Sequence, residues 1–219
     1  MQNYYLLYQE ELIILAALFD MEYVYGLVGE KNEEEVPYRI HQMVRNGVLY
    51  TQEESIYVAE PYKYMLQSMK SASSILKLVS AEGQIIWFYL GSNIVEIEES
   101  QTDKKTLRIS NMTVEEVLFL LAERFLPEEY LNSELFGIET KEEVYGALEE
   151  AQVYLLFELI NAGVRQEELT IKVIQSRHNL WVVQYDDMGV VVNMKPYKKE
   201  SLLDMLRKTM DKEGKNDIG

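Results

Sequence analysis

The sequence predicts an α+β protein with two similar halves, each a small β-sheet followed by a helix. Ile75–Phe125 contains two or three strand-like segments and then an amphipathic helix, and Leu169–Met210 repeats that order. Each stretch carries one of the only two tryptophans, Trp87 and Trp181, in a strand just after a polar turn. A chain of 219 residues is long enough for both halves to share one body.

The composition narrows the classes of function. Acidic residues outnumber basic ones by 37 to 21, and the formal net charge of −16 disfavours binding to nucleic acid or anionic lipid. Cysteine is absent, which excludes disulfides, thiolate nucleophiles and Cys-based zinc sites and is typical of a reducing cytoplasm. The N-terminus has no basic segment, and the apolar run Leu12–Phe19 is too short to cross a bilayer. We therefore expect a cytoplasmic protein with neither a signal peptide nor membrane insertion.

The N-terminal half is expected to span residues 1–130. It opens with a helix over Gln9–Leu27, whose apolar residues have helical spacing and whose end is marked by Gly26 and Gly29. Residues 36–70 then order helix, glycine stop, strand, acidic turn, strand and helix, which is the order of a small winged-helix unit. Its predicted elements are Pro37–Arg45, Val48–Tyr50, Ile56–Ala59 and Tyr62–Met69.

The sheet of this half is expected within residues 75–109, and its helix within 114–125. The strands indicated are Ile75–Ser80, Gln84–Leu90 and Ile94–Glu98, with a fourth left open at Thr106–Ile109. Thr113 and Glu116 have the spacing of a capping box, in which the hydroxyl and the carboxylate each accept a hydrogen bond from the other residue's amide. The helix is therefore expected to begin directly after Thr113.

The C-terminal half is expected to span residues 131–210, after a connector at Leu126–Thr140. A long helix is predicted over Glu142–Asn161, which is rich in Leu, Val and Tyr and is followed by Ala162-Gly163. The remaining elements, a hairpin, a third strand and a final helix, are Leu169–Gln175, Asn179–Tyr185, Val190–Met194 and Lys199–Thr209. The tail Asp211–Gly219 is charged and lacks apolar anchors, so we expect it to fray.

No motif indicates catalysis, a cofactor or a metal. The only histidines, His41 and His178, lack the spacing of zinc or catalytic sites. The glycines form neither a dinucleotide-binding nor a Walker pattern, and no nucleophile elbow is present. We predict a non-enzymatic protein with no catalytic, cofactor-binding or metal-binding residue. One alternative is a hydrolase built on acidic pairs such as Asp186/Asp187, which requires two carboxylates facing one cleft.

A second alternative is a transcription regulator that uses the winged-helix-like segment. Its recognition helix would be Pro37–Arg45, in which Arg39 and Arg45 are the only lysine or arginine residues. Glu53 and Glu54 occupy the tip of the wing and would repel phosphates, so the charges favour a protein-binding or architectural role. The sixteen tyrosines and ten methionines agree with a protein-recognition surface, because Tyr and Met are enriched at interfaces.

The order of elements resembles the EspG-type chaperones of type VII secretion systems. The resemblance extends over most of Gln9–Met210 and ends with a second, similar half. The segments that carry it are the opening helix Glu11–Leu18, the helix-to-glycine stretch Val44–Leu49, the hairpin-rich Ile75–Ile109 and the helix Val114–Phe125.

This resemblance implies a fold, a function and a partner. The fold would be a central, mostly antiparallel sheet built from two quasi-symmetric halves and flanked by helices. The function would be that of a cytoplasmic chaperone, which binds a secreted helical-hairpin protein and covers its apolar tip before export. The chain is rich in Lys, Glu, Asn, Ile and Tyr and poor in Ala and Arg, unlike the mycobacterial members. This bias suggests a divergent member from a low-GC Gram-positive bacterium, with partners of the WXG or LXG type.

We predict the protein-binding site at a long loop and its adjoining strand. Loop 98–105 accounts for much of the difference in length between the two halves, and the strand would supply an apolar floor. The predicted contact residues are Trp87, Phe88, Tyr89, Glu98, Glu99, Ser100, Gln101, Thr102, Asp103, Lys104 and Lys105. The sequence leaves open the oligomeric state and whether the winged-helix-like segment binds anything.

Overall fold

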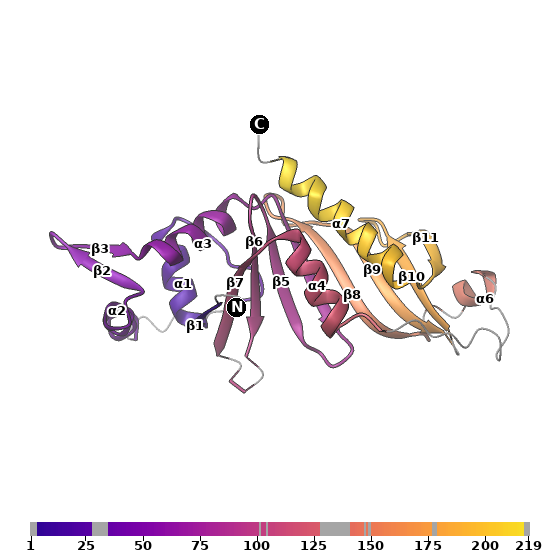
Figure 1. Ribbon diagram of the computed structural model, residues 1–219, viewed down its shortest axis with the longest axis horizontal. Helices are drawn as coiled ribbons and strands as arrows, with labels where there is room; N and C mark the ends of the chain where they lie inside the picture. Colours follow the sequence, from indigo (N-terminus) through magenta and orange to yellow (C-terminus); the bar gives the residue numbers. More distant parts are fainter. Residues whose placement is uncertain are drawn as a thin grey trace.

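A nine-stranded antiparallel sheet forms the centre of the computed structural model (Figure 1). The structure describes residues 4–27, 35–100, 102, 103, 105–127, 141–146, 148, 150–176 and 179–216. The strands of this sheet are β1 (Tyr4–Tyr8), β4 (Ser74–Ser80), β5 (Ile85–Leu90), β6 (Ile94–Glu99), β7 (Thr106–Met112), β8 (Gln152–Asn161), β9 (Glu167–Ser176), β10 (Asn179–Tyr185) and β11 (Val191–Pro196). Their order across the sheet is β1-β7-β6-β5-β4-β8-β9-β10-β11, and every neighbouring pair is antiparallel.

Two four-stranded units, each followed by a helix, make up most of the sheet. Strands β4 to β7 lead into α4 (Val114–Arg124), and strands β8 to β11 lead into α7 (Lys199–Asn216). The units meet at the antiparallel pair β4–β8, and from this pair the strands of each unit follow one another outward in opposite directions. The α+β class and the antiparallel sheet with two similar halves are therefore confirmed.

The helix predicted over Glu142–Asn161 is wrong. The structure has a short helix, α6 (Lys141–Gly146), and then β8, the strand that joins the two units. β8 lies in the middle of the sheet and contributes Phe157 to the core on one face and Ile160 to the core on the other. A strand that is apolar on both faces has no alternating pattern, so periodicity does not separate it from a buried helix.

Both tryptophans lie on strands, as predicted, but these are not corresponding strands of the two units. Trp87 lies on β5, the second strand of its unit, whereas Trp181 lies on β10, the third strand of its unit. Each unit has four strands rather than three, because Thr106–Met112 and Gln152–Asn161 are both strands. The two units repeat the same order of strands and helix, but the tryptophans do not mark equivalent positions in them.

The ends of the chain differ from the prediction as well. β1 was not expected, and α1 (Gln9–Leu18) ends well before Leu27. α7 continues to Asn216, so the expected fraying from Asp211 is wrong for residues 211–216. Most of the predicted connector and His178 lie outside the described residues.

The winged-helix-like segment has the predicted order of elements. These are α2 (Val36–Arg45), β2 (Leu49–Gln52), β3 (Ser55–Val58) and α3 (Glu60–Ser71). At the tip of the wing, Glu53 and Glu54 have φ angles of 48° and 65°, as a tight two-residue hairpin turn requires. In Figure 1 this hairpin projects away from the large sheet.

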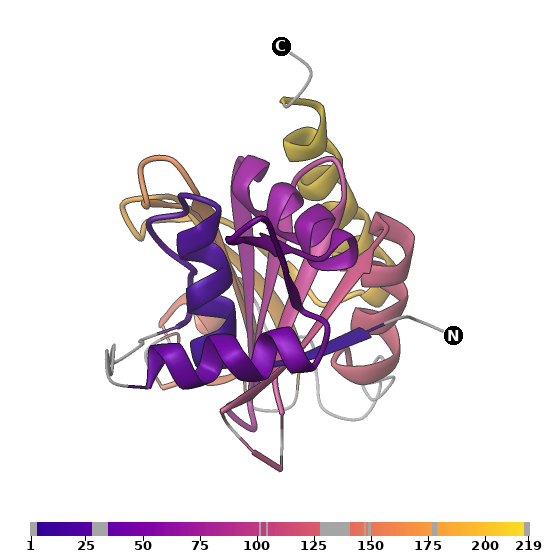
Figure 2. The same ribbon diagram turned by 90° about the vertical axis from the view of Figure 1, so that its left-hand side faces the viewer.

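Helices cover both faces of the large sheet. α4 and α7 pack against each other and against one face, here called the α4–α7 face, whose core includes Phe88, Leu121 and Leu206. α1 and α3 contribute to the core of the opposite face in the first unit, with Leu12 and Leu66. Figure 2 shows α1 on one side of the sheet and α4 with α7 on the other. No described helix combines the length and apolar composition that a membrane span requires.

Candidate functional site

The predicted apolar floor on β5 is largely buried. Phe88 is 0% exposed in the core beneath α4 and α7, and Tyr89 is 2% exposed in the opposite core. The Tyr89 hydroxyl accepts a hydrogen bond from the Tyr25 amide at 2.8 Å, and burial raises the pKa of Tyr89 above its ordinary value. The partly buried ring of Trp87 packs against Tyr25, and Lys77 Nζ lies 5.4 Å from its centroid. Phe88 and Tyr89 therefore stabilise the sheet and offer no open surface to a partner.

The predicted loop forms the turn between β6 and β7. The Ser100 amide donates to the Thr106 carbonyl at 2.8 Å, and the Asp103 carboxylate accepts hydrogen bonds from the Lys105 amide at 3.0 Å and the Thr106 hydroxyl at 2.8 Å. The hydrogen bond from the Lys105 amide is the largest cause of the lowered pKa of Asp103. The exposed predicted contacts in this turn are Glu99, Thr102, Asp103 and Lys105, while Gln101 and Lys104 lie outside the described residues. The turn is thus internally bonded and solvent-facing.

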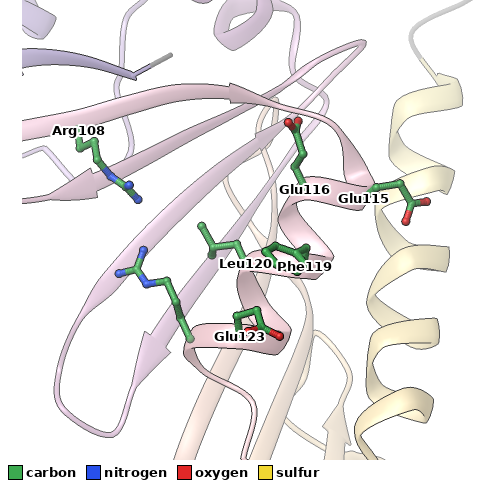
Figure 3. A pocket seen from close by; sticks show the side chains of 7 residues that line it. Arg108, Glu115, Glu116, Phe119, Leu120 and Glu123 are labelled. Carbon is green, nitrogen blue, oxygen red and sulfur yellow. The ribbon is translucent and has the colours of Figure 1, made fainter. Parts of the chain in front are cut away.

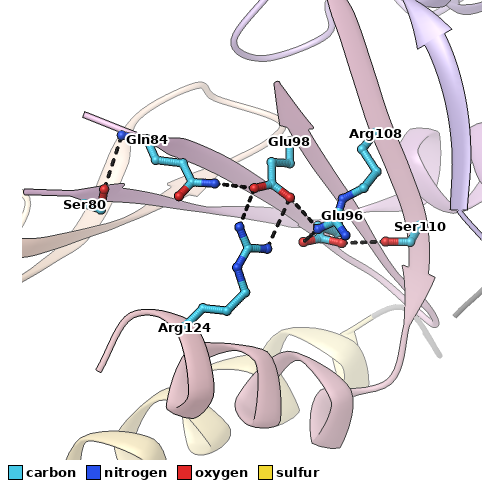
Figure 4. Close-up of polar contacts among 7 residues, drawn as sticks. All are labelled: Ser80, Gln84, Glu96, Glu98, Arg108, Ser110 and Arg124. Carbon is cyan, nitrogen blue, oxygen red and sulfur yellow. Dashed lines mark hydrogen bonds and ion pairs between the residues drawn. The ribbon is translucent and has the colours of Figure 1, made fainter. Parts of the chain in front are cut away.

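Glu98 belongs to a network of charges between the sheet and α4 (Figure 4). Arg108 on β7 donates to Glu98 and, at 3.1 Å, to Glu96, both of which lie on β6. Arg124 on α4 donates from Nη2 to Glu98 Oε1 at 2.6 Å and from Nη1 to Oε2 at 3.3 Å. The Gln84 amide is a further donor to Glu98. The network therefore ties three elements of the first unit together through one buried carboxylate.

The two carboxylates of the network differ in the direction of their pKa shifts. Glu96 is 0% exposed, and burial raises its pKa although Ser110 and Arg108 donate hydrogen bonds to it. Burial acts on Glu98 in the same direction, but hydrogen bonds from Arg124 and the charge of Arg108 outweigh it and lower the pKa. Glu98 is consequently the member that stays ionised and holds both guanidinium groups in place.

A groove of about 560 Å³ lies beside this network on the α4–α7 face (Figure 3). It is lined by Arg108, Glu115, Glu116, Phe119, Leu120, Glu123 and Arg124. The Phe119 side chain is 68% exposed, whereas Leu120 is buried. α4 begins with the predicted capping box, which is confirmed: the Thr113 hydroxyl accepts from the Glu116 amide at 3.3 Å, and the Glu116 carboxylate accepts from the Thr113 amide at 2.8 Å. We call this feature the α4 groove.

A strip of exposed apolar side chains on β1 continues the α4 groove toward the edge of the sheet. In the β1–β7 register, Leu6 lies opposite Arg108, Tyr4 opposite Ser110 and Tyr8 opposite Thr106. Directly paired residues share a face of the sheet, so these three β1 side chains lie on the same face as the groove. Leu6 is 58% exposed, and both tyrosines are exposed as well. We call Tyr4, Leu6 and Tyr8 the β1 strip.

The sequence analysis missed both the β1 strip and the arginines of the network. β1 is five residues long and alternates imperfectly in burial, so it gives a weak strand signal. β6 is misleading in another way, because Glu96 and Glu98 alternate with apolar residues and this pattern predicts a face turned to solvent, whereas the structure buries both carboxylates. Buried carboxylates require cationic or hydrogen-bonding partners, which the facing strand supplies with Arg108.

The winged-helix-like segment directs little positive charge outward in its described residues. The guanidinium of Arg39 lies 5.0 Å from the ring centroid of Tyr8, so it is turned toward β1. Arg45 is exposed at the end of α2, and the exposed wing tip carries Glu53 and Glu54. This distribution of charge is poorly suited to a phosphate backbone.

Two kinds of catalytic arrangement, a metal site and a pair of carboxylates facing one cleft, can be checked in the described residues. No group of three or more His, Asp or Glu side chains in the described ranges is arranged to hold a metal ion. Glu96 and Glu98 project from one strand and already accept hydrogen bonds from Arg108, Arg124 and Ser110. A glycosidase-type pair instead flanks its substrate with two carboxyl groups facing one cleft.

Comparisons with known proteins give a likeness in fold. No family model and no curated protein matches the chain. A solved structure with a similar fold is the Mycobacterium tuberculosis type VII secretion system chaperone EspG5 in complex with the PE25–PPE41 dimer. The similarity has a TM-score of 0.58 and 9% sequence identity, and it covers 96% of this chain and 96% of that chain. At this level of identity the likeness describes the fold.

Proposed function

We propose that this protein is a non-enzymatic, EspG-like chaperone of the cytoplasm that binds a secreted helical protein of a type VII secretion system. The observation that carries the proposal is the similarity in fold to EspG5 over 96% of both chains. The solved neighbour is itself in complex with the PE25–PPE41 dimer, which supports a protein partner for this fold. The partner of the present chain would be a helical-hairpin protein of the WXG or LXG type.

The open surface of the first unit supports a binding role. Phe119 and the β1 strip place large exposed apolar side chains beside charged ones, and such a patch is typical of a protein–protein interaction site. An exported protein with an exposed apolar end is an aggregation hazard, and an interface of about 800 Å² per partner is enough to cover such an end. The turn 98–105 stays a predicted contact, because it joins β6 to β7 and β7 is the strand that pairs with β1.

Co-expression tests this proposal directly. The chain is produced together with candidate helical-hairpin proteins of the WXG and LXG types, and complexes are isolated by an affinity tag and weighed by light scattering after gel filtration. We expect a defined 1:1 or 1:1:1 complex that keeps the partner soluble. A chain that elutes alone with every candidate contradicts the proposal.

A pair of surface variants locates the interface in the same experiment. Leu6→Ser removes an exposed side chain of the β1 strip, and Tyr64→Ser removes an exposed side chain of α3 as a matched control. We expect the first variant to lower recovery of the partner and the second to leave it unchanged. Equal recovery with both variants would place the interface elsewhere.

A further inference from the structure

The described helices of the α4–α7 face, α4 and α7, stop short of the sheet's edge at β1. α4 packs beside α7, and Arg124 at its end reaches Glu98 on β6. In Figure 1, β6 and β7 lie beside α4 with no described helix in front of them. Neighbouring strands are about 4.8 Å apart, so the strip formed by β7 and β1 is about as wide as one helix with its side chains. This strip, which none of the described helices covers, therefore has the width of a third helix beside α4.

Apolar side chains border this strip on two sides. Phe119, on α4, lines the α4 groove and is 68% exposed. Leu6 and the tyrosines of the β1 strip lie on the sheet surface across from it. A helix placed between them would bury apolar surface against a neighbouring helix and against the sheet, as α4 does beside α7.

The charges that line the α4 groove are predominantly negative, whereas Arg39 of α2 lies over Tyr8 at one end of the β1 strip. Glu115, Glu116 and Glu123 line the α4 groove, and Glu96 and Glu98 lie below it. The cations of the lining are Arg108 and Arg124, which Glu98 already engages. Glu115 is paired with Arg207 of α7, and Glu116 accepts the capping hydrogen bonds from Thr113, while both Glu116 and Glu123 are exposed. A partner helix that carries positive charge beside its apolar ridge is complementary to this lining.

We infer that the α4 groove and the β1 strip receive an amphipathic helix of the partner, whose apolar ridge is flanked by Lys or Arg. This inference rests on the proposed function and names the chemistry of the helix that is bound. The helix completes the layer begun by α7 and α4, with its ridge against Phe119 and Leu6. Its basic side chains face Glu116 and Glu123 on α4.

Two synthetic peptides test the inference with the full chain. Both are helical 18-residue peptides with leucine at positions i, i+3, i+4 and i+7; one carries lysine and the other glutamate at the flanking positions. Binding of the labelled peptides is followed by fluorescence anisotropy at low ionic strength and again at about 0.15 M salt. We expect the lysine peptide to bind about tenfold more tightly than the glutamate peptide, with the difference shrinking in salt.

Variants with matched controls locate the bound peptide. Phe119→Ser should weaken the lysine peptide about tenfold, whereas Tyr64→Ser on α3 should not. Glu123→Lys should reduce the preference for lysine over glutamate about threefold or more, whereas Asp187→Lys, which makes the same change of charge in the β10–β11 turn, should not. All four positions are exposed, so their substitution leaves the cores of the fold intact.

Each other outcome overturns the inference. Equal affinity for the two peptides, binding to neither peptide, or wild-type binding by Phe119→Ser contradicts a basic-flanked helix in this groove. A dimer of the chain that Phe119→Ser dissociates would assign the surface to a second copy instead. Co-expression with secreted proteins tests the proposed function, and peptide binding tests the inference. Either experiment can therefore give a negative result while the other gives a positive one.

Discussion

The two four-stranded units share a topology but differ in what they present to the α4–α7 face. In the first unit, β6 directs Glu96 and Glu98 toward α4. In the second unit, the corresponding strand β10 directs Val182 into the core and Gln184 toward Met205 of α7. The helix of the second unit is also longer, with 18 residues against 11. The comparison teaches that the same order of strands and helix can join its helix to the sheet by apolar packing or through a buried charge network beside an open groove.

The outer strands of the two units differ in the same sense. β11 contains Lys195 and Pro196 and meets a register shift in its pairing with β10, features that discourage other strands from adding to a sheet edge. β1, which extends the first unit, is Tyr-Tyr-Leu-Leu-Tyr and has no charged residue. The two edges of the sheet therefore differ in charge rather than in apolar exposure. β1 is uncharged and exposes Leu6, whereas β11 places Lys195 and Pro196 beside its exposed Val192.

The largest expected effect tests whether the two helices contribute equally to one cooperative core. Leu121 on α4 and Leu206 on α7 are both 0% exposed in the same core. Replacing either with alanine should lower the free energy of unfolding by about 3 kcal/mol, measured by urea denaturation. A separate early transition in only one variant would show that the units unfold independently and would break the comparison.

A smaller effect sharpens the contrast between β6 and β10. Glu98→Ala leaves two guanidinium groups without their shared carboxylate and should lower the free energy of unfolding by about 2–3 kcal/mol. Gln184→Ala removes one neutral polar contact at the corresponding strand and should lower it by about 1 kcal/mol. Equal losses in the two variants, measured by urea denaturation, would mean that the charge network holds no special place in the first unit.

The smallest expected effect is a dependence on pH that the buried Glu96 gives to the first unit. The pKa of Glu96 is raised in the folded state, so its contribution to stability is complete below the ordinary value of 4.5 and is lost as pH rises through the folded pKa. Glu96→Gln keeps a neutral group at every pH. The difference in free energy of unfolding, Glu96→Gln minus the natural chain, should therefore rise with pH above 4.5 and then level off.

The control for this measurement is Glu167→Gln, at an exposed position on β9. The Glu98 pKa is lowered, so the stability it contributes is lost as pH falls through the folded pKa, in the natural chain and in Glu96→Gln alike. A difference between Glu96→Gln and the natural chain that stays constant or falls between about pH 4 and pH 8 contradicts the assignment of the raised pKa.

Local signals in the sequence predicted much of the fold. The capping box of Thr113 and Glu116, the hairpin around Gly83 and the order of elements in residues 36–70 all depend on neighbouring residues, and the structure has each of them. The helix predicted over Glu142–Asn161 failed because the apolar character of β8 comes from two cores that meet across the sheet. That property depends on strands far away in the sequence.

The candidate site was less accessible to the same reasoning. Trp87, Phe88 and Tyr89 form an apolar run, but only the pairing of β5 with both neighbours shows that Phe88 and Tyr89 are buried. Glu98 looked like the start of an acidic loop, whereas the register with β7 and the position of α4 make it the centre of a buried network. Such long-range pairings leave no mark in a single sequence.

The β4–β8 pair has a consequence for how the chain reaches its native state. Each unit is built from successive hairpins, whose strands are close in sequence, whereas Lys77 and Glu158 across β4–β8 are 81 residues apart. Contacts of such high sequence separation form slowly, because a long loop must close first. Until β8 pairs with it, β4 is therefore an unpaired edge strand of the newly synthesised first unit. β8 is likewise an unpaired edge strand of the second unit until the two meet. A protein proposed to protect another chain from aggregation is therefore itself exposed to aggregation during its own synthesis.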